Sequence, residues 1–441
     1  MRFLLATLAA LALAASVTAA DRKPNIIVIL SDDVGYGEYG FQGNKEIPTP
    51  NIDSIAKNGV RFTDGYIAAT YCSPCRAGLM TGRYPTRFGH EYNEGQPTEN
   101  GRQFGLPVEQ KTIADRLKPL GYATFAVGKW HLGNGPQQIA TARGFDEFYG
   151  TVANTPYLNP PNFIDTRVSP KVTPVKDDNF YTTDAYAERC VDILGKNKDK
   201  PFFLYIPFNA QHAPLQPTQK YLDRFPNIAD ENRKKFAATM SAMDDAVGRV
   251  LGKVRELGLE ENTLIIFFSD NGGPTMQTTS KNDPLRGRKA TTLEGGIRIP
   301  FCMQWKGKIP AGATYTHPMI QLDILPTVVT AAGGKIEPDW KLDGVDLMPY
   351  LTGKVKDPPH PVLYWRFGEQ WAVRKGDFKL VASAVDGVKN VKLYNLKDDI
   401  GESKDLSAAM PEKVKELKAD WDKWNAENID PLWVPAKKKD N

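Results

Sequence analysis

The chain has 441 residues, 41% hydrophobic and 24% charged, a composition that is ordinary for a globular protein and excludes intrinsic disorder. Its 56 Lys and Arg residues against 52 Asp and Glu residues give a formal net charge of +4, too balanced to indicate binding of nucleic acid or electrostatic attachment to a membrane. A chain of this length can bury one large core and carry a smaller second unit.

The first 20 residues are typical of a secretory signal peptide. Arg2 follows the initial methionine, an apolar run covers residues 3–15, and small residues at 17–20 suit a cleavage site. The apolar run is too short to span a bilayer, and no later segment approaches a span. We therefore expect a periplasmic or secreted protein without an integral membrane span.

Short apolar, β-rich runs alternate with helix-like stretches along residues 21–355, which predicts an α/β fold with a mostly parallel central sheet flanked by helices. The clearest runs cover residues 25–30, 123–127, 202–207 and 264–268. One helix between them has clear ends, with Thr112 as its N-cap, Asp115 three residues later and Gly121 as its stop.

Each of these four runs is followed by polar residues. The polar segments are residues 31–33, 128–131, 209–212 and 269–273. Because ligand sites of open α/β sheets lie at the carboxyl ends of the strands, we expect these segments to converge on one pocket.

The pattern of predicted elements changes beyond residue 343. Residues 357–361 contain three prolines and indicate a linker, and the strand-like segments after it cover 362–366, 371–374, 378–382 and 391–396. A charged helix is predicted from Pro411 to about Trp424. These elements predict a small antiparallel sheet with a packed helix, which forms a C-terminal subdomain over residues 356–441.

Residues 72–83 read Cys-Ser-Pro-Cys-Arg-Ala-Gly-Leu-Met-Thr-Gly-Arg. Pro74 suits the first turn of a helix and Gly82 its end, so we predict a helix over residues 75–81. Cys72 then lies at the helix N-terminus, where free N–H groups favour an anion such as sulfate or phosphate. Arg76 adds a guanidinium fork that matches a tetrahedral oxyanion.

Cysteine spacing alone leaves other interpretations open. Cys72 and Cys75 form a C-x-x-C pair, which also occurs in redox dithiols, in zinc sites and as an inert structural pair. The spacing of Cys190 and Cys302 does not tell whether these two residues are joined.

Four residues that follow the first and last runs offer only oxygen ligands: Asp32, Asp33, Asp270 and Asn271. Such a set suits a hard divalent cation, Ca²⁺ in the first place and Mg²⁺ as the alternative. A turn or a loop after a strand would explain either pair by itself, so the metal site depends on both pairs meeting near residue 72.

The stretch 72–83 resembles the signature of type I sulfatases. Other segments are similar to motifs of the same family, namely Gly-Lys-Trp-His-Leu-Gly at 128–133, the stretch 285–300, and Leu-Tyr-Asn-Leu at 393–396 with Glu402 and Leu406. The resemblance covers nearly the whole mature chain and implies the fold of the alkaline phosphatase superfamily, with residues 21–355 as catalytic domain. It also implies that a formylglycine-generating or equivalent sulfatase-maturing enzyme oxidises Cys72 to formylglycine (3-oxoalanine).

The resemblance further implies roles for the polar residues. The hydrated formylglycine attacks sulfur and forms a sulfo-enzyme, from which sulfate leaves as the aldehyde reforms. The cation is bound by residue 72 together with Asp32, Asp33, Asp270 and Asn271. His131 handles the proton of the diol, whereas Arg76 and Lys129 hold residue 72 and the sulfate. Lys289 contacts sulfate near the leaving oxygen, and His212 protonates the departing alcohol.

Two further residues bear on the substrate. We interpret His90, which follows the signature, as part of a sugar-binding pocket, with a surface histidine as the alternative. Arg288 stands where the family often has glycine and is bulky enough to reshape substrate access. The sequence thus predicts an exported sulfatase that acts on a sulfated small molecule or glycan. The alternatives are a phosphate or phosphonate ester hydrolase on the same fold, or a non-catalytic glycan-binding or thiol protein with unmodified Cys72.

Overall fold

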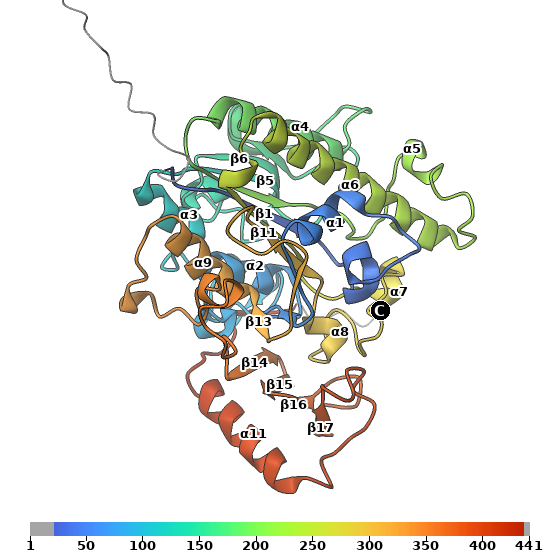
Figure 1. Ribbon diagram of the computed structural model, residues 1–441, viewed down its shortest axis with the longest axis vertical. Helices are drawn as coiled ribbons and strands as arrows, with labels where there is room; N and C mark the ends of the chain where they lie inside the picture. Colours follow the sequence, from blue (N-terminus) through green and yellow to red (C-terminus); the bar gives the residue numbers. More distant parts are fainter. Residues whose placement is uncertain (1–21, 436–441) are drawn as a thin grey trace, which may run out of the picture.

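Ten strands form one mixed, mostly parallel sheet in the computed structural model, which describes residues 22–435 (Figure 1). The expected signal peptide at residues 1–20 lies outside the described residues. In spatial order the strands are β12 (Ala313–Tyr315), β2 (Val60–Phe62), β11 (Phe301–Gln304), β10 (Thr263–Ser269), β1 (Asn25–Ser31), β9 (Phe202–Pro207), β5 (Ala123–Lys129), β6 (Glu147–Thr151), β7 (Phe163–Asp165) and β8 (Ser169–Thr173).

Helices cover both faces of this sheet (Figure 1). One face packs against α1 (Pro50–Lys57), α4 (Thr182–Asn197) and α6 (Glu231–Glu256), and the other against α2 (Cys72–Thr81), α3 (Ile113–Leu117) and α9 (Ile324–Ala331). Side chains of β1 alternate between these two cores, since Ile27 and Ile29 face the first and Ile26 and Val28 the second. A strand that is buried on both faces explains the continuous apolar run in the sequence.

The remaining elements are short or belong to the C-terminal part. The short ones are α5 (Gln219–Leu222), α7 (Thr275–Thr278), α8 (Glu294–Ile297) and α10 (Met348–Leu351), together with the strand pairs β3 (Gly65–Tyr66) with β13 (Met319–Ile320) and β4 (Gln96–Pro97) with β18 (Trp433–Val434). Within the described range 22–435, no helix combines the length and apolar character that a membrane crossing requires.

The C-terminal part holds a four-stranded antiparallel sheet with one long helix against it (Figure 1). Its strands are β14 (Val362–Phe367), β15 (Gln370–Lys375), β16 (Phe378–Ala382) and β17 (Lys392–Asn395), and its helix is α11 (Pro411–Asn425). The expected fold class, an α/β fold with a small antiparallel sheet, is confirmed. The division into a catalytic domain and a subdomain at residue 356 stays a prediction.

Element ends differ from the prediction in two instructive places. The signature helix begins at Cys72 rather than at residue 75 and ends at Gly82, whose φ is 64°. Pro74 is tolerated there because the first N–H groups of a helix have no partner within it. The helix after Thr112 has the expected capping box with Asp115, but only Ile113–Leu117 are α-helical and a 3₁₀ turn continues to Gly121.

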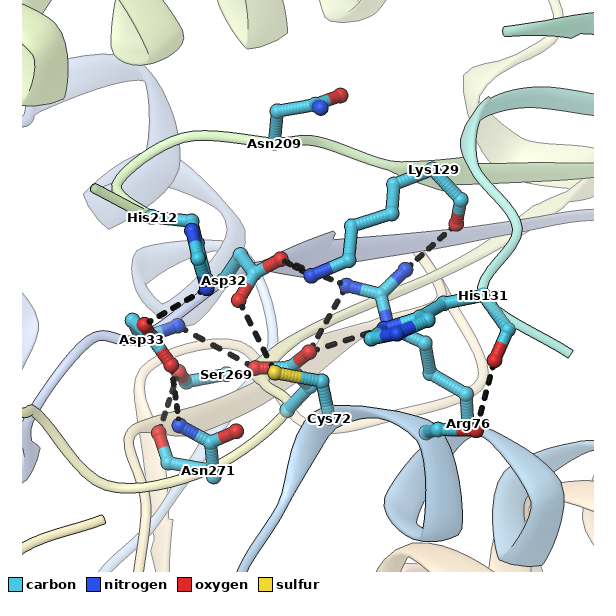
Figure 2. Close-up of polar contacts among 12 residues, drawn as sticks. Asp32, Asp33, Cys72, Arg76, Lys129, His131, Asn209, His212, Ser269 and Asn271 are labelled. Atoms are coloured by element: carbon cyan, nitrogen blue, oxygen red, sulfur yellow. Dashed lines mark hydrogen bonds and ion pairs between the residues drawn. The ribbon is translucent and has the colours of Figure 1, made fainter. Parts of the chain in front are cut away.

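Four neighbouring strands run parallel and place the predicted polar segments at one edge. Strand β1 pairs in parallel with β10 and β9, and β9 pairs in parallel with β5. The carboxyl ends of these strands deliver Asp32, His212 and Lys129 to one region, and Cys72 at the start of α2 lies beside them (Figure 2). Asp270, which follows β10, belongs to the same cluster. The expected convergence of the four segments is therefore found in the structure.

Candidate active site

Cys72 is the first residue of α2, and its side chain is fully buried. Its Sγ donates to Asp32 Oδ1 at 3.6 Å and accepts from Lys289 Nζ at 3.3 Å. Burial, together with the charge of Asp32, raises the pKa of this thiol to about 12 despite Lys129 and Lys289 nearby. An unmodified Cys72 is therefore a protonated thiol, which is a poor nucleophile and a poor redox group.

None of the four cysteines forms a disulfide, and all four are buried. The open question about Cys190 and Cys302 is therefore answered by two separate thiols. Cys75 is likewise not joined to Cys72, and its Sγ accepts a weak hydrogen bond of 3.8 Å from Gln321 Nε2. These contacts give no support to a redox dithiol or a zinc site.

Three aspartates surround the Cys72 sulfur. One ligand atom from each of Asp32, Asp33, Cys72 and Asp270 lies within 4.8 Å of the others, and all four residues are buried. Asn271 lies beside this group of residues, and its Nδ2 donates to Asp33 Oδ1 at 2.7 Å. Within residues 22–435, Asp33 Oδ2 and Asn271 Oδ1 are buried acceptors without a hydrogen-bond donor.

Buried acceptors of this kind require a hydrogen-bond donor or a cation. Carboxylate and amide oxygens gathered around one point match the ligands that Ca²⁺ and Mg²⁺ prefer. The residues present therefore fit a divalent cation, and the position of Sγ marks where an oxygen of a modified residue 72 would lie.

Three cationic side chains form ion pairs with these acids, and Figure 2 shows two of them, Arg76 and Lys129. Arg76 donates to Asp270 Oδ2 at 2.8 Å and to Asp32 Oδ2 at 3.2 Å. Lys129 pairs with Asp32, and Lys289 Nζ lies 2.6 Å from Asp33 Oδ1. Burial acts to raise the pKa of Asp32, but Lys129, His212 and Arg76 outweigh it and hold that pKa well below its usual value. Asp32 is thus kept ionised in a buried place, whereas burial and the charge of Asp32 raise the pKa of Asp270 to about 6 despite Arg76.

Arg76 differs from the expected role of holding residue 72. Its Nη1 donates to the Lys129 carbonyl at 2.6 Å, while Nε and Nη2 are directed at the aspartates. In the structure it therefore fixes the acid cluster and the end of β5, and its contact with a bound sulfate stays a prediction.

Two histidines flank the acid cluster. His212 Nδ1 donates to the Ala213 carbonyl at 2.6 Å, which leaves Nε2 directed to the site, 3.7 Å from Asp33 Oδ2. Burial lowers the pKa of His212 despite the charge of Asp33. His131 is also buried, and burial together with Lys129 and Arg76 keeps its pKa well below the ordinary value. Both imidazoles are therefore neutral near pH 7 and able to accept a proton.

The expected place of His90 in a sugar-binding pocket is wrong, and so is the alternative of a surface position. Its ring is fully buried and packs edge-on against Trp433, with ring centroids 4.7 Å apart. Its Nε2 lies 2.7 Å from Ser73 Oγ, which in turn donates to the His131 carbonyl at 2.7 Å. His90 is therefore linked to the backbone of His131 through Ser73, and no motif in the sequence indicates this connection.

Two of these residues have unusual backbone geometry. Asp33 has φ 65° and His131 φ 57°, in the left-handed region that non-glycine residues rarely occupy. Such strain persists only where surrounding contacts enforce it, and it gathers at functional sites. The Ser73 contact is one such support for His131.

A pocket of about 770 Å³ opens above the cluster. His212 and Lys289, which both contact Asp33, line it, and so do Ala384 and Val385 from the loop between β16 and β17. The C-terminal sheet thus supplies part of the pocket, which sequence reasoning missed because the two segments are about 100 residues apart.

Comparison with known proteins agrees with this geometry. A model of the sulfatase family matches residues 24–334. Arylsulfatase A of Homo sapiens is 33% identical over 461 residues, covering 92% of this chain and 89% of that protein. N-acetylgalactosamine-6-sulfatase of Sus scrofa is 33% identical over 392 residues, or 82% of this chain and 72% of its own. The crystal structure of Ps i-CgsB in complex with k-i-k-neocarrahexaose aligns with a TM-score of 0.84 and 34% identity, covering 94% of this chain and 95% of its own.

Proposed function

The chain belongs to the sulfatase family, as a type I sulfatase of the alkaline phosphatase superfamily, and on that premise we propose how its buried site hydrolyses sulfate esters. It is a sulfuric ester hydrolase. We propose that its substrate is a sulfated carbohydrate, that residue 72 acts as formylglycine, and that a divalent cation is bound beside it. Export through residues 1–20 is part of the same proposal.

One observation carries this proposal: a fully buried Cys72 at a helix N-terminus, surrounded by three aspartates and three cationic side chains. A protonated thiol would be a poor nucleophile there. Converted to formylglycine, residue 72 would supply in its hydrated form the hydroxyl that attacks sulfur. The cation, Ca²⁺ or Mg²⁺, would be held by Asp32, Asp33, Asp270 and Asn271 and would add positive charge that polarises the sulfate.

The protein's own residues divide the remaining work. Lys289 contacts both Asp33 and residue 72 and also lines the pocket, which supports a role for its ammonium in holding a sulfate oxygen. Neutral His131 would take a proton from residue 72. His212, with Nδ1–H fixed on the Ala213 carbonyl, presents Nε2 toward the pocket. Because the neutral ring carries no proton on Nε2, this atom would first take up a proton from solvent and then donate it to the departing alcohol oxygen.

A carbohydrate is the substrate class that the comparisons and the pocket favour. Ps i-CgsB, which is similar over nearly its whole length, is described with a bound neocarrahexaose. The pocket of this chain is wide, and amide side chains of Asn93, Asn154 and Gln277 line it. Amides both donate and accept hydrogen bonds, as sugar hydroxyls require.

The test is a measurement of sulfate release by protein made with a formylglycine-generating enzyme. A panel of sulfated mono- and oligosaccharides is compared with 4-nitrophenyl sulfate and 4-nitrophenyl phosphate. We expect sulfate release from at least one sugar, faster than phosphate release from the aryl phosphate. Mass spectrometry of the peptide that contains residue 72 should show formylglycine. Unmodified thiol throughout, or a dominant phosphatase activity, would contradict the proposal.

Two variants test the assigned roles. Cys72→Ala and His212→Ala should keep the melting temperature of the parent protein and lose most turnover, roughly a hundredfold or more. Full activity in either variant would remove that residue from the mechanism.

A further inference from the structure

The wall of the active-site pocket carries a cationic side chain that no acidic group among residues 22–435 neutralises. Arg288 is exposed and lines the pocket, and its guanidinium has no hydrogen bond or ion pair within the described part of the chain. Its neighbours differ, because Arg286 pairs with Asp386 at 2.6 Å and Lys289 with Asp33 at 2.6 Å. Of these three cations, Arg288 alone has no acidic partner among residues 22–435.

The backbone that carries Arg288 is held firmly. Arg288 N donates to Thr291 Oγ1 at 3.1 Å, and Thr291 Oγ1 donates back to the Arg288 carbonyl at 2.7 Å. Ala290 N donates to the carbonyl of Thr70, two residues before Cys72, at 3.1 Å. Gln370 Nε2 of the C-terminal sheet donates to the Ala290 carbonyl at 2.9 Å. The root of the Arg288 side chain is therefore fixed beside the reacting group, although its end is free.

The rest of the pocket wall does not supply a counter-charge. No aspartate or glutamate lines the pocket among the described residues. Its other lining groups include amides and the exposed apolar side chains of Met276 and Val385, which are 86% and 44% exposed. A neutral sugar could use the amides and the apolar surface, but it would leave the Arg288 guanidinium without a partner.

We propose that Arg288 binds a second anionic group of the substrate, a sulfate or a carboxylate, next to the sulfate ester that is cleaved. This inference rests on the proposed function and narrows it to carbohydrates that carry at least two negative charges. The guanidinium fork matches the paired oxygens of either anion. Lys289 and Arg288 are adjacent in the chain, so one short segment would bind the reacting sulfate and its charged neighbour.

The experiment compares kcat/KM for three matched substrates. They are the singly sulfated disaccharide that the panel identifies, the same disaccharide with a second sulfate, and the same disaccharide with a carboxylate at C6 of the adjoining sugar. We expect the wild-type enzyme to prefer at least one doubly charged substrate by roughly tenfold or more. Which of the two is preferred tells whether the second group is sulfate or carboxylate.

The decisive variant is Arg288→Gln, which should reduce the preference for the doubly charged substrate about tenfold, mainly through KM. Arg288→Lys should keep part of the preference, because it retains the charge but loses the fork. Arg255→Gln is the matched control, since Arg255 is an exposed arginine near the end of α6 that does not line the pocket. It should leave the preference as in the wild-type enzyme.

The outcomes separate the two proposals. A wild-type preference that Arg288→Gln retains, or equal turnover of all three substrates, would overturn the role of Arg288 while the sulfatase activity stands. Loss of the preference in both Arg288→Gln and Arg255→Gln would also overturn it, because it would show an effect of overall charge. Absence of sulfate release from every sulfated substrate tested would instead contradict the proposed function.

Discussion

Removing Lys379 should destabilise the protein through a buried charge network that joins the C-terminal sheet to the catalytic part. Lys379 lies on β16 and is fully buried, with Nζ 2.8 Å from Glu294 Oε1 and 2.8 Å from Glu402 Oε1. Glu294 begins α8, and its Oε2 lies 3.4 Å from Arg298 Nη1. Burial and the neighbouring Glu294 raise the pKa of Glu402 to about 7 despite Lys379. Two carboxylates thus share one lysine away from water.

The expected magnitude follows from this burial. Lys379→Met leaves two buried carboxylates without their common partner, which costs about 3–5 kcal/mol. With an unfolding entropy of about 2.1 cal/mol/K per residue, roughly 0.9 kcal/mol/K for the whole chain, the melting temperature should fall by about 3–6 °C. Changing Glu402→Gln in addition removes one excess negative charge and should restore a large part of the loss.

Calorimetry and urea unfolding of the parent, the single variant and the double variant provide the measurement. Lys196→Met on α4 is the control, because Lys196 is 69% exposed and its pair with Asp192 should contribute less than about 1 kcal/mol. If Lys379→Met costs no more than Lys196→Met, or if the second change lowers stability further, then the reasoning about an uncompensated buried charge is wrong.

Three further predictions concern the metal, pH and the support of His131. Chelation with EDTA should abolish turnover and, for a cation present at about 100 times its Kd, lower stability by about 2.7 kcal/mol. Ca²⁺ should restore both better than Mg²⁺, and metal analysis that finds neither ion bound would contradict this. Burial disfavours the charged form of His360, but Asp323 outweighs it and raises the pKa of His360 above 6.5. That pair stabilises the fold fully below pH 6.5 and loses its effect as the pH rises through the folded pKa of His360. The melting temperatures of wild type and His360→Asn should therefore differ more at pH 6 than at pH 9. An equal difference at both pH values would exclude the pair as the cause. Ser73→Ala should lower kcat roughly tenfold with little change in KM, because the His131 carbonyl loses the hydrogen bond from Ser73 Oγ. An unchanged kcat would show that Ser73 does not position His131.

Local patterns in the sequence were sufficient to predict much of the fold and the main residues of the site. The apolar runs that became β1, β5, β9 and β10 needed no tertiary information, because strands buried on both faces are apolar throughout. Polar residues at their carboxyl ends could be placed together by the general rule for parallel sheets. The stretch 72–83 indicated a helix and an anion site by its own proline, glycine and arginine.

Other features depend on contacts between distant segments. Arg76 was expected to face the substrate, yet its guanidinium bonds to Asp32, 44 residues away, and to Asp270, 194 residues away. His90 looked like a pocket residue, but the packing of Trp433 buries it. No sequence pattern indicates either arrangement, because each results from the packing of elements that are distant in the chain.

The sequence by itself determined which chemical groups are present and at which end of the sheet they gather, since strand burial and helix ends are local properties of the chain. Only the tertiary structure decided which charges neutralise one another. Lys289 forms an ion pair with Asp33, whereas Arg288 beside it lines the pocket without an acidic partner among residues 22–435. Charge pairing depends on distances of a few ångströms between segments that only the folded chain brings together.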